Sequence, residues 1–96
     1  MTKMEAMERL DMYERMCCRD PGVGWSKYEF KRACYQKSIL PFVRERIEHG
    51  MLDPLTEIHG LKMELDDRIG DSDNARTWEF CSIVCDILSD ILDFIA

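Results

Sequence analysis

The C-terminal segment, residues 78–95, carries the most regular apolar pattern in the chain. Apolar side chains recur there at intervals of three and four residues, in two adjacent rows. The first row is Trp78, Cys81, Cys85, Leu88, Leu92 and Ile95, and the second is Phe80, Val84, Ile87, Ile91 and Phe94. This spacing is typical of an α-helix with one buried face. Two adjacent rows make that face unusually wide, which is much apolar surface for a chain of 96 residues to cover.

The remaining face of this helix is a narrow, mostly acidic strip. It consists of Glu79, Ser82, Asp86, Ser89, Asp90 and Asp93. The strip belongs to an acidic half of the chain: residues 1–48 carry ten Lys/Arg and eight Asp/Glu, while residues 49–96 carry three and eleven. The two halves either neutralise each other within the fold or give the surface two faces. A net charge of −6 disfavours general nucleic-acid binding and favours a basic partner.

Helix-start signals divide the rest of the chain into three further helices. Two are capping boxes, in which a Ser or Thr and a Glu three residues later satisfy free amide groups. The third is an aspartate N-cap followed by a proline at the first helical position. These signals are Thr2 with Glu5, Ser26 with Glu29, and Asp53 with Pro54. They predict helices over 3–19, 27–49 and 54–69, and the polar turn 71–74 caps the fourth helix.

Proline and glycine punctuate these helices. Asp20-Pro21-Gly22-Val23-Gly24 is predicted to be a turn, and Gly50 and Gly70 are predicted to end the second and third helices. Pro41 lies inside the second helix, which is therefore predicted to be kinked or broken there. The expected inward residues of the first helix are Met4, Met7, Leu10, Tyr13 and Cys17. Those of the third are Leu55, Ile58, Leu61, Leu65 and Ile69.

Length and composition predict one all-α domain over residues 1–96, a compact antiparallel bundle of four helices with short connections. No apolar run has the length of a membrane span, and the N-terminus has no apolar leader segment. The five cysteines are an odd number, which favours free thiols in a reducing compartment. We therefore expect a cytoplasmic protein that does not enter a membrane.

Motifs for catalysis or metal binding are missing from the sequence. Cys81 and Cys85 are four residues apart, but the paired knuckles of a structural zinc site are not present. The aspartates near residue 71 begin like a calcium loop, yet Arg76 occupies the glycine position and Ser82 the glutamate position. Cys34 has basic neighbours but no histidine nearby in sequence to act as a base. We expect no catalytic residue, no metal ligand and no cofactor, and hence no enzyme.

The second helix is apolar on two opposite sides. One side carries Phe30, Ala33, Cys34 and Leu40, and the other carries Tyr28, Arg32, Tyr35 and Ile39. Either the helix is central and packs both ways, or one side contacts a protein or another copy of the chain. Tyrosine and arginine are enriched at binding hot spots. The same side can also stack a nucleobase and hold a phosphate. Binding of a nucleotide or nucleic acid is therefore a third hypothesis for this side of the helix.

These patterns predict a small, acidic, non-enzymatic binding protein. It would regulate or inhibit a protein partner with a basic surface by steric occlusion, as accessory or inhibitor proteins of phages, mobile elements and immunity systems do. The expected partner-binding residues are Tyr28, Arg32, Tyr35, Glu79, Asp86, Asp90 and Asp93. The wide apolar faces predict a homodimer or higher oligomer. The alternatives are an oligomer that sequesters a nucleotide or other small ligand, and a nucleic-acid binder acting through the basic second helix, which the net charge disfavours.

Overall fold

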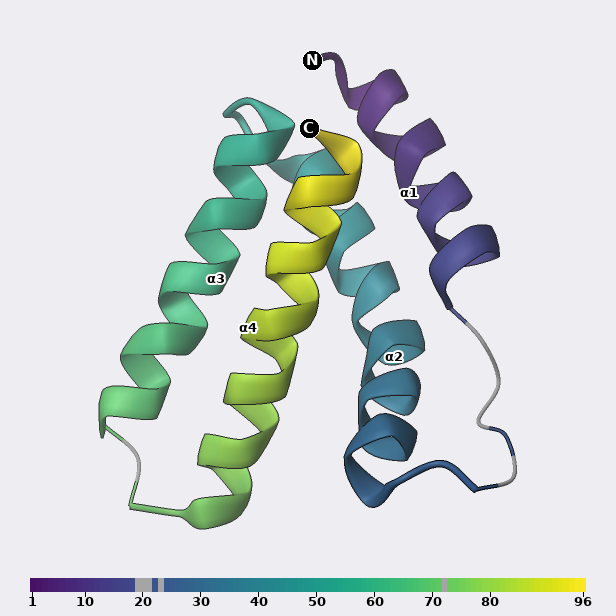
Figure 1. Cartoon of the computed structure of the whole chain (residues 1–96). Coiled ribbons are helices and arrows are strands. Elements are labelled where there is room, and N and C mark those ends of the chain that lie inside the picture. Colours follow the sequence, from purple (N-terminus) through teal and green to yellow (C-terminus); the bar gives the residue numbers. More distant parts are fainter. Residues whose placement is uncertain (19–21, 23, 72) are drawn as a thin grey trace.

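The computed structural model describes residues 1–18, 22, 24–71 and 73–96, and it is all-helical (Figure 1). The four helices are α1 (Lys3–Cys17), α2 (Lys27–His49), α3 (Pro54–Asp71) and α4 (Ala75–Ile95). No strand occurs in the described ranges, so the predicted all-α class is confirmed. The N- and C-termini lie at the same end of the molecule in Figure 1. None of these helices combines the length and apolar character that crossing a membrane requires, as far as the described residues extend.

Two of the predicted helix starts rest on the expected capping groups of α1 and α2. At α2 the capping box is complete: the Glu29 amide donates to Ser26 Oγ at 3.1 Å, and the Ser26 amide donates to Glu29 Oε2 at 3.3 Å. At α1 only half of the box is formed in the described structure. There the Glu5 amide donates to Thr2 Oγ1 at 3.1 Å, without the return contact from the glutamate side chain. One satisfied amide is enough to define the start of α1.

The starts of α3 and α4 also follow the sequence. The Leu55 amide donates to Asp53 Oδ2 at 3.1 Å, as expected for an N-cap placed before Pro54. Within the predicted polar turn, Asn74 is the residue that caps α4, because its Oδ1 accepts a hydrogen bond from the Arg76 amide at 2.9 Å. Local polar chemistry therefore sets where each helix begins.

The predicted helix ends are less accurate. Helix α1 ends at Cys17 rather than near residue 19, which lies outside the described residues together with most of the turn predicted over 20–24. Helix α3 continues through Gly70 to Asp71, so the predicted stop at this glycine is wrong. Glycine ends a helix when the chain must turn there, but it also fits within the last helical turn. Helix α2 is continuous through Pro41, so the predicted break is not observed.

Helix α4 provides the largest share of the core of any helix, as its two apolar rows predict. It contacts each of the other three helices, and in Figure 1 it lies between α3 and α2. Its buried residues are Cys81, Ile83, Val84, Cys85, Ile87, Leu88, Ile91, Leu92 and Ile95. The first turns are the exception, since Trp78 and Phe80 are exposed where both rows predicted burial. The buried face therefore begins at Cys81, one turn later than the apolar pattern does.

Helix α1 packs through Leu10 and Tyr13 as predicted, but two other residues of the predicted inward face are exposed. Its buried residues are Ala6, Leu10 and Tyr13, whereas Met4 is 73% exposed and Cys17 is exposed as well. Met7 is partly buried against the core. The predicted burial of Met4 and Cys17 is wrong, because the buried face of α1 is centred nearer to Ala6, which is fully buried. A small alanine is easily buried and places the helix face on which it lies against the core.

Candidate functional site

The predicted partner-binding residues of α2 and α4 meet where these two helices pack together. Arg32 lies at the centre of this contact. Its Nε donates to Asp86 Oδ2 at 3.3 Å, and its Nη2 donates to Asp90 Oδ2. The acidic strip of α4 is thus partly neutralised by α2 of the same chain. Of the two explanations for the charge asymmetry, these contacts favour neutralisation within the fold.

The neighbouring residues of α2 also use their polar or aromatic groups within the chain. The Tyr28 hydroxyl donates to Asp86 Oδ2 at 3.4 Å, and Lys31 Nζ lies 2.8 Å from Glu79 Oε1. The Tyr35 ring meets Phe80 edge to face, with ring centroids 5.1 Å apart. Because the Tyr35 ring already packs against Phe80, it is the least available of the predicted anchors for contact with a partner. Tyr28 keeps half of its surface exposed.

The carboxylates nevertheless stay accessible. The side chains of Asp86 and Asp90 are 57% and 52% exposed although both contact Arg32. Asp93 is exposed and forms no ion pair with any described residue. Four carboxylates of the strip face two cations, Lys31 and Arg32, so an excess of negative charge remains. This surface can attract a cationic group without first losing its internal contacts.

Trp78 belongs to this surface, although its spacing placed it in the buried rows. It is 53% exposed and lies in the first turn of α4. Residues at intervals of three and four share a helix face. The row that begins at this tryptophan is Trp78, Ser82, Asp86, Ser89 and Asp93, in which the two serines are partly buried and the other three side chains are exposed. We call this row, with the flanking Asp90 and Tyr28, the acidic ridge. The sequence signal that Trp78 belongs to it is the four-residue step from Trp78 to Ser82.

Helix α2 connects the ridge to the rest of the molecule through three arginines. Each arginine bridges two carboxylates, and each pair belongs to a different helix. The contacts are Arg32 with Asp86 and Asp90 of α4, Arg44 with Asp11 and Glu14 of α1, and Arg46 with Glu57 and Glu64 of α3. Two of these arginines pair with acids of the second half of the chain. The charge difference between the halves is therefore partly neutralised inside the fold.

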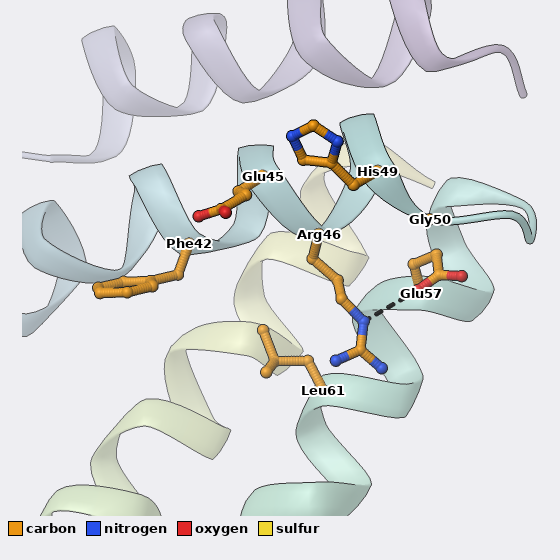
Figure 2. A pocket seen from close by; sticks show the side chains of 7 residues that line it. All are labelled: Phe42, Glu45, Arg46, His49, Gly50, Glu57 and Leu61. Atoms are coloured by element: carbon orange, nitrogen blue, oxygen red, sulfur yellow. Dashed lines mark hydrogen bonds and ion pairs between the residues drawn. The ribbon is translucent and has the colours of Figure 1, made fainter.

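A hollow of about 590 Å³ opens between α2 and α3 (Figure 2). It is lined by Phe42, Glu45, Arg46, His49, Gly50, Glu57 and Leu61. Arg46 crosses it: its Nε donates to Glu57 Oε2 at 2.9 Å, and Glu57 Oε1 accepts from the Leu52 amide at 3.2 Å. The lining holds one histidine but no Ser, Thr or Cys, so it offers no hydroxyl or thiol nucleophile. Its central ion pair holds α2 to α3 rather than a ligand.

The buried polar groups are also engaged within the chain. Gln36 Nε2 donates to the Tyr13 hydroxyl oxygen at 2.6 Å, and burial of this tyrosine raises its pKa to about 12. The Cys85 thiol donates to Asp66 Oδ1 at 3.3 Å; burial first, and then this carboxylate, raise its pKa to about 12. Cys85 therefore stays a neutral thiol at physiological pH. Across the described ranges, no group of three or more His, Cys, Asp or Glu side chains is placed to hold a metal ion.

Comparison with known proteins gives no match, whether to a family model, a curated protein or a solved structure. The structure brings Tyr28, Arg32, Glu79, Asp86 and Asp90 together across α2 and α4, as side-chain contacts show. Tyr35 also lies at this contact, through its ring pair with Phe80 of α4. Asp93 lines a hollow together with Arg32 and Asp90.

Proposed function

We propose that this chain is a non-enzymatic binding protein whose acidic ridge covers a basic surface of a partner protein. By occupying that surface, the chain would regulate or inhibit the partner through steric occlusion. The observation that carries the proposal is the ridge itself: the half-exposed carboxylates of Asp86 and Asp90 lie on the same helix as an exposed tryptophan, Trp78. An inhibitor of a phage, mobile-element or immunity type, acting in the cytoplasm, fits this description.

The contacts of Arg32 support this use of the ridge. The arginine bridges Asp86 and Asp90 and so holds two carboxylates in fixed positions before a partner arrives. A pre-organised surface loses less conformational freedom on binding. The excess negative charge would steer a basic partner toward the ridge, which raises the association rate more than the affinity. Trp78 and Tyr28 are residue types that anchor interfaces, and both are about half exposed.

The same contacts make the phosphate-binding alternatives weaker. A nucleotide or nucleic acid bound at this stripe would need Arg32 for its phosphate group. The guanidinium already pairs with two aspartates, and its side chain is only 22% exposed. A phosphate would have to displace carboxylates and then lie among the remaining acids. We therefore place the ligand-sequestering and nucleic-acid readings behind the protein-binding one.

Two substitutions test the ridge without removing its internal ion pairs. Trp78→Ala removes the aromatic anchor, and Asp93→Lys reverses a charge that has no ion-pair partner among the described residues. Immobilised full-length chain would capture the partner from an extract of its own cells, and the purified partner would then be titrated at several salt concentrations. We expect Trp78→Ala to weaken binding about tenfold or more. Asp93→Lys should slow association and flatten its salt dependence.

The control is Met63→Ala on α3, which shortens an exposed side chain away from the ridge. It should bind like the wild-type chain. Substituting Asp86 or Asp90 is less informative, because it would remove a ridge carboxylate and release Arg32 at the same time. Binding that both ridge variants leave unchanged, or a bound partner that retains full activity, would refute the proposal.

We also propose that the four helices form a compact antiparallel bundle and that α2 bends at Pro41. The reason is local: proline has no amide hydrogen, so one bond of the helical ladder is not formed there. The angle between the axes of residues 27–40 and 42–49 in an experimental structure tests the bend. We expect more than about 20°, and a straight axis would contradict it.

A further inference from the structure

Helix α2 has one face that no other helix covers. Its buried row, which includes Ala33, Leu40 and Val43, faces the other three helices, and α2 contacts all of them. The residues on the opposite side are exposed along the whole helix. We call these the outward row: Lys27, Lys31, Cys34, Ser38, Pro41, Glu45 and Glu48. Their alternating spacing of four and three residues keeps them in one line, as in the contact row of a coiled coil.

The outward row is suited to contact with a protein surface. Its middle consists of the small or apolar residues Cys34, Ser38 and Pro41, which let a second helix approach closely. Phe30 and Phe42 lie on its two edges and are 53% and 67% exposed. These two rings lie on opposite edges of the same helix face and are both in contact with water. Something that covers the row would remove both rings from water.

The charges of the row are complementary to those of the same row running in the opposite direction. Lys27 lies at its beginning, and Glu45 and Glu48 lie at its end. None of these three side chains forms an ion pair within the described part of the chain, whereas Lys31 is paired with Glu79. When two copies of α2 pack antiparallel about a two-fold axis at the level of residue 36, Lys27 faces Glu45 of the other copy. Cys34 then faces Ser38, and Pro41 faces Lys31.

The exposed area is large enough for such a contact. The chain exposes 6388 Å², whereas a monomeric protein of its mass exposes about 5,700 Å². The excess of roughly 700 Å² is close to the ~800 Å² that each partner buries in a standard interface. A flattened shape accounts for it, because the Cα atoms extend 37 × 35 Å but only 18 Å in the third direction. A second copy on one face would restore an ordinary ratio of surface to mass.

We propose that this chain forms a two-fold symmetric homodimer in which the outward rows of two α2 helices pack antiparallel. Each copy contributes the same surface, so the contact is closed and does not propagate into a fibre. The antiparallel direction also sets the helix dipoles favourably, since the N-terminus of each helix lies near the C-terminus of the other. The proposal is independent of the partner-binding function. The acidic ridge consists of α4 residues and Tyr28, and none of them belongs to the outward row.

Sedimentation equilibrium of the full-length chain in reducing buffer gives the first test. We expect twice the chain mass of 11.3 kDa. Lys27→Glu and Glu45→Lys should each weaken the dimer about tenfold or more, because each creates two like-charge contacts in a symmetric interface. The double variant Lys27→Glu/Glu45→Lys reverses both charges and should recover the dimer. Circular dichroism checks the fold of each variant, which these exposed positions should leave intact.

Disulfide trapping tests the register. In a Cys17→Ser/Cys18→Ser background, Ser38→Cys places a thiol opposite Cys34 of the other copy, so mild oxidation should link two chains. The two remaining cysteines, Cys81 and Cys85, are buried and do not compete. Met12→Cys, on the exposed face of α1, is the control in the same background and should link far more slowly.

The outcomes separate this inference from the proposed function. A monomer at all concentrations overturns the dimer, and so does a dimer that neither charge reversal weakens and that Ser38→Cys fails to link. Trp78→Ala and Asp93→Lys should leave the dimer intact, because both residues lie on the acidic ridge. If those two variants lose the dimer, the interface lies on α4 and the present inference is wrong.

Discussion

Two arginines of α2 make the same kind of contact in different surroundings. Arg32 bridges Asp86 and Asp90 of α4, and Arg46 bridges Glu57 and Glu64 of α3. Both aspartates are more than half exposed, whereas the Glu57 side chain is only 9% exposed. Water screens the first contact strongly and the second much less. Each arginine forms two ion pairs, so the two contacts differ mainly in that one carboxylate, Glu57, is buried.

The comparison separates a structural contact from a surface that is available for binding. Glu57 has lost most of its hydration and depends on Arg46 and the Leu52 amide to compensate for it. Asp86 and Asp90 stay hydrated, so Arg32 fixes the positions of these carboxylates but adds little to the stability of the fold. An exposed network can exchange partners at little cost, which is what a docking surface needs.

The largest effect is expected from removing Arg46. Arg46→Met leaves Glu57 buried without a counter-ion and should lower the free energy of unfolding by about 3 kcal/mol. Urea denaturation followed by circular dichroism measures it. Adding Glu57→Gln to this variant removes the uncompensated charge and should restore part of the loss. A loss as small as that of an exposed pair would mean that water reaches Glu57 and that the comparison fails.

Gly50 tests the packing behind the same carboxylate. Its φ of −72° suits any residue, but a Cβ atom there would lie 2.5 Å from Glu57 Cδ and 2.6 Å from the Arg46 carbonyl oxygen. Gly50→Ala should therefore destabilise the protein by about 1–3 kcal/mol, as overpacking does. Gly70→Ala on the last turn of α3 is the matched control, since a Cβ atom there meets nothing within 4 Å. It should be neutral or slightly stabilising, and equal losses at the two glycines would rule out the contact as the cause.

The smallest effect is expected at Arg32. Arg32→Met removes two exposed ion pairs and should lower the free energy of unfolding by only about 0.5–1 kcal/mol. The difference from wild type should shrink further in ~1 M salt, while the loss at Arg46 persists. Denaturation curves for both variants at low and high salt make the comparison. A loss at Arg32 that resists salt would show that the ridge is a structural element and not a free surface.

The sequence predicted the positions of the helices well, but it predicted poorly which residues of each helix contact the other helices. Capping residues such as Ser26, Asp53 and Asn74 define the helix starts because they act on amides within three residues of themselves. The acidic ridge was predicted except for Trp78, since residues on one face follow from helix periodicity alone. The predicted burial of Trp78 is wrong. Exposure depends on where the neighbouring helices end, and the spacing of apolar residues within one segment gives no information about that.

By itself, the amino-acid sequence determined four helices, the wide apolar face of α4 and the row of acids opposite it. These features depend on local hydrogen bonds and on a fixed helical period. Only the tertiary structure decided that Arg32, Arg44 and Arg46 each reach a different helix, that Ala6 rather than Met4 faces the core, and that the outward row of α2 is left uncovered. Periodicity fixes which side chains share a face, but the packing of whole helices fixes what that face meets.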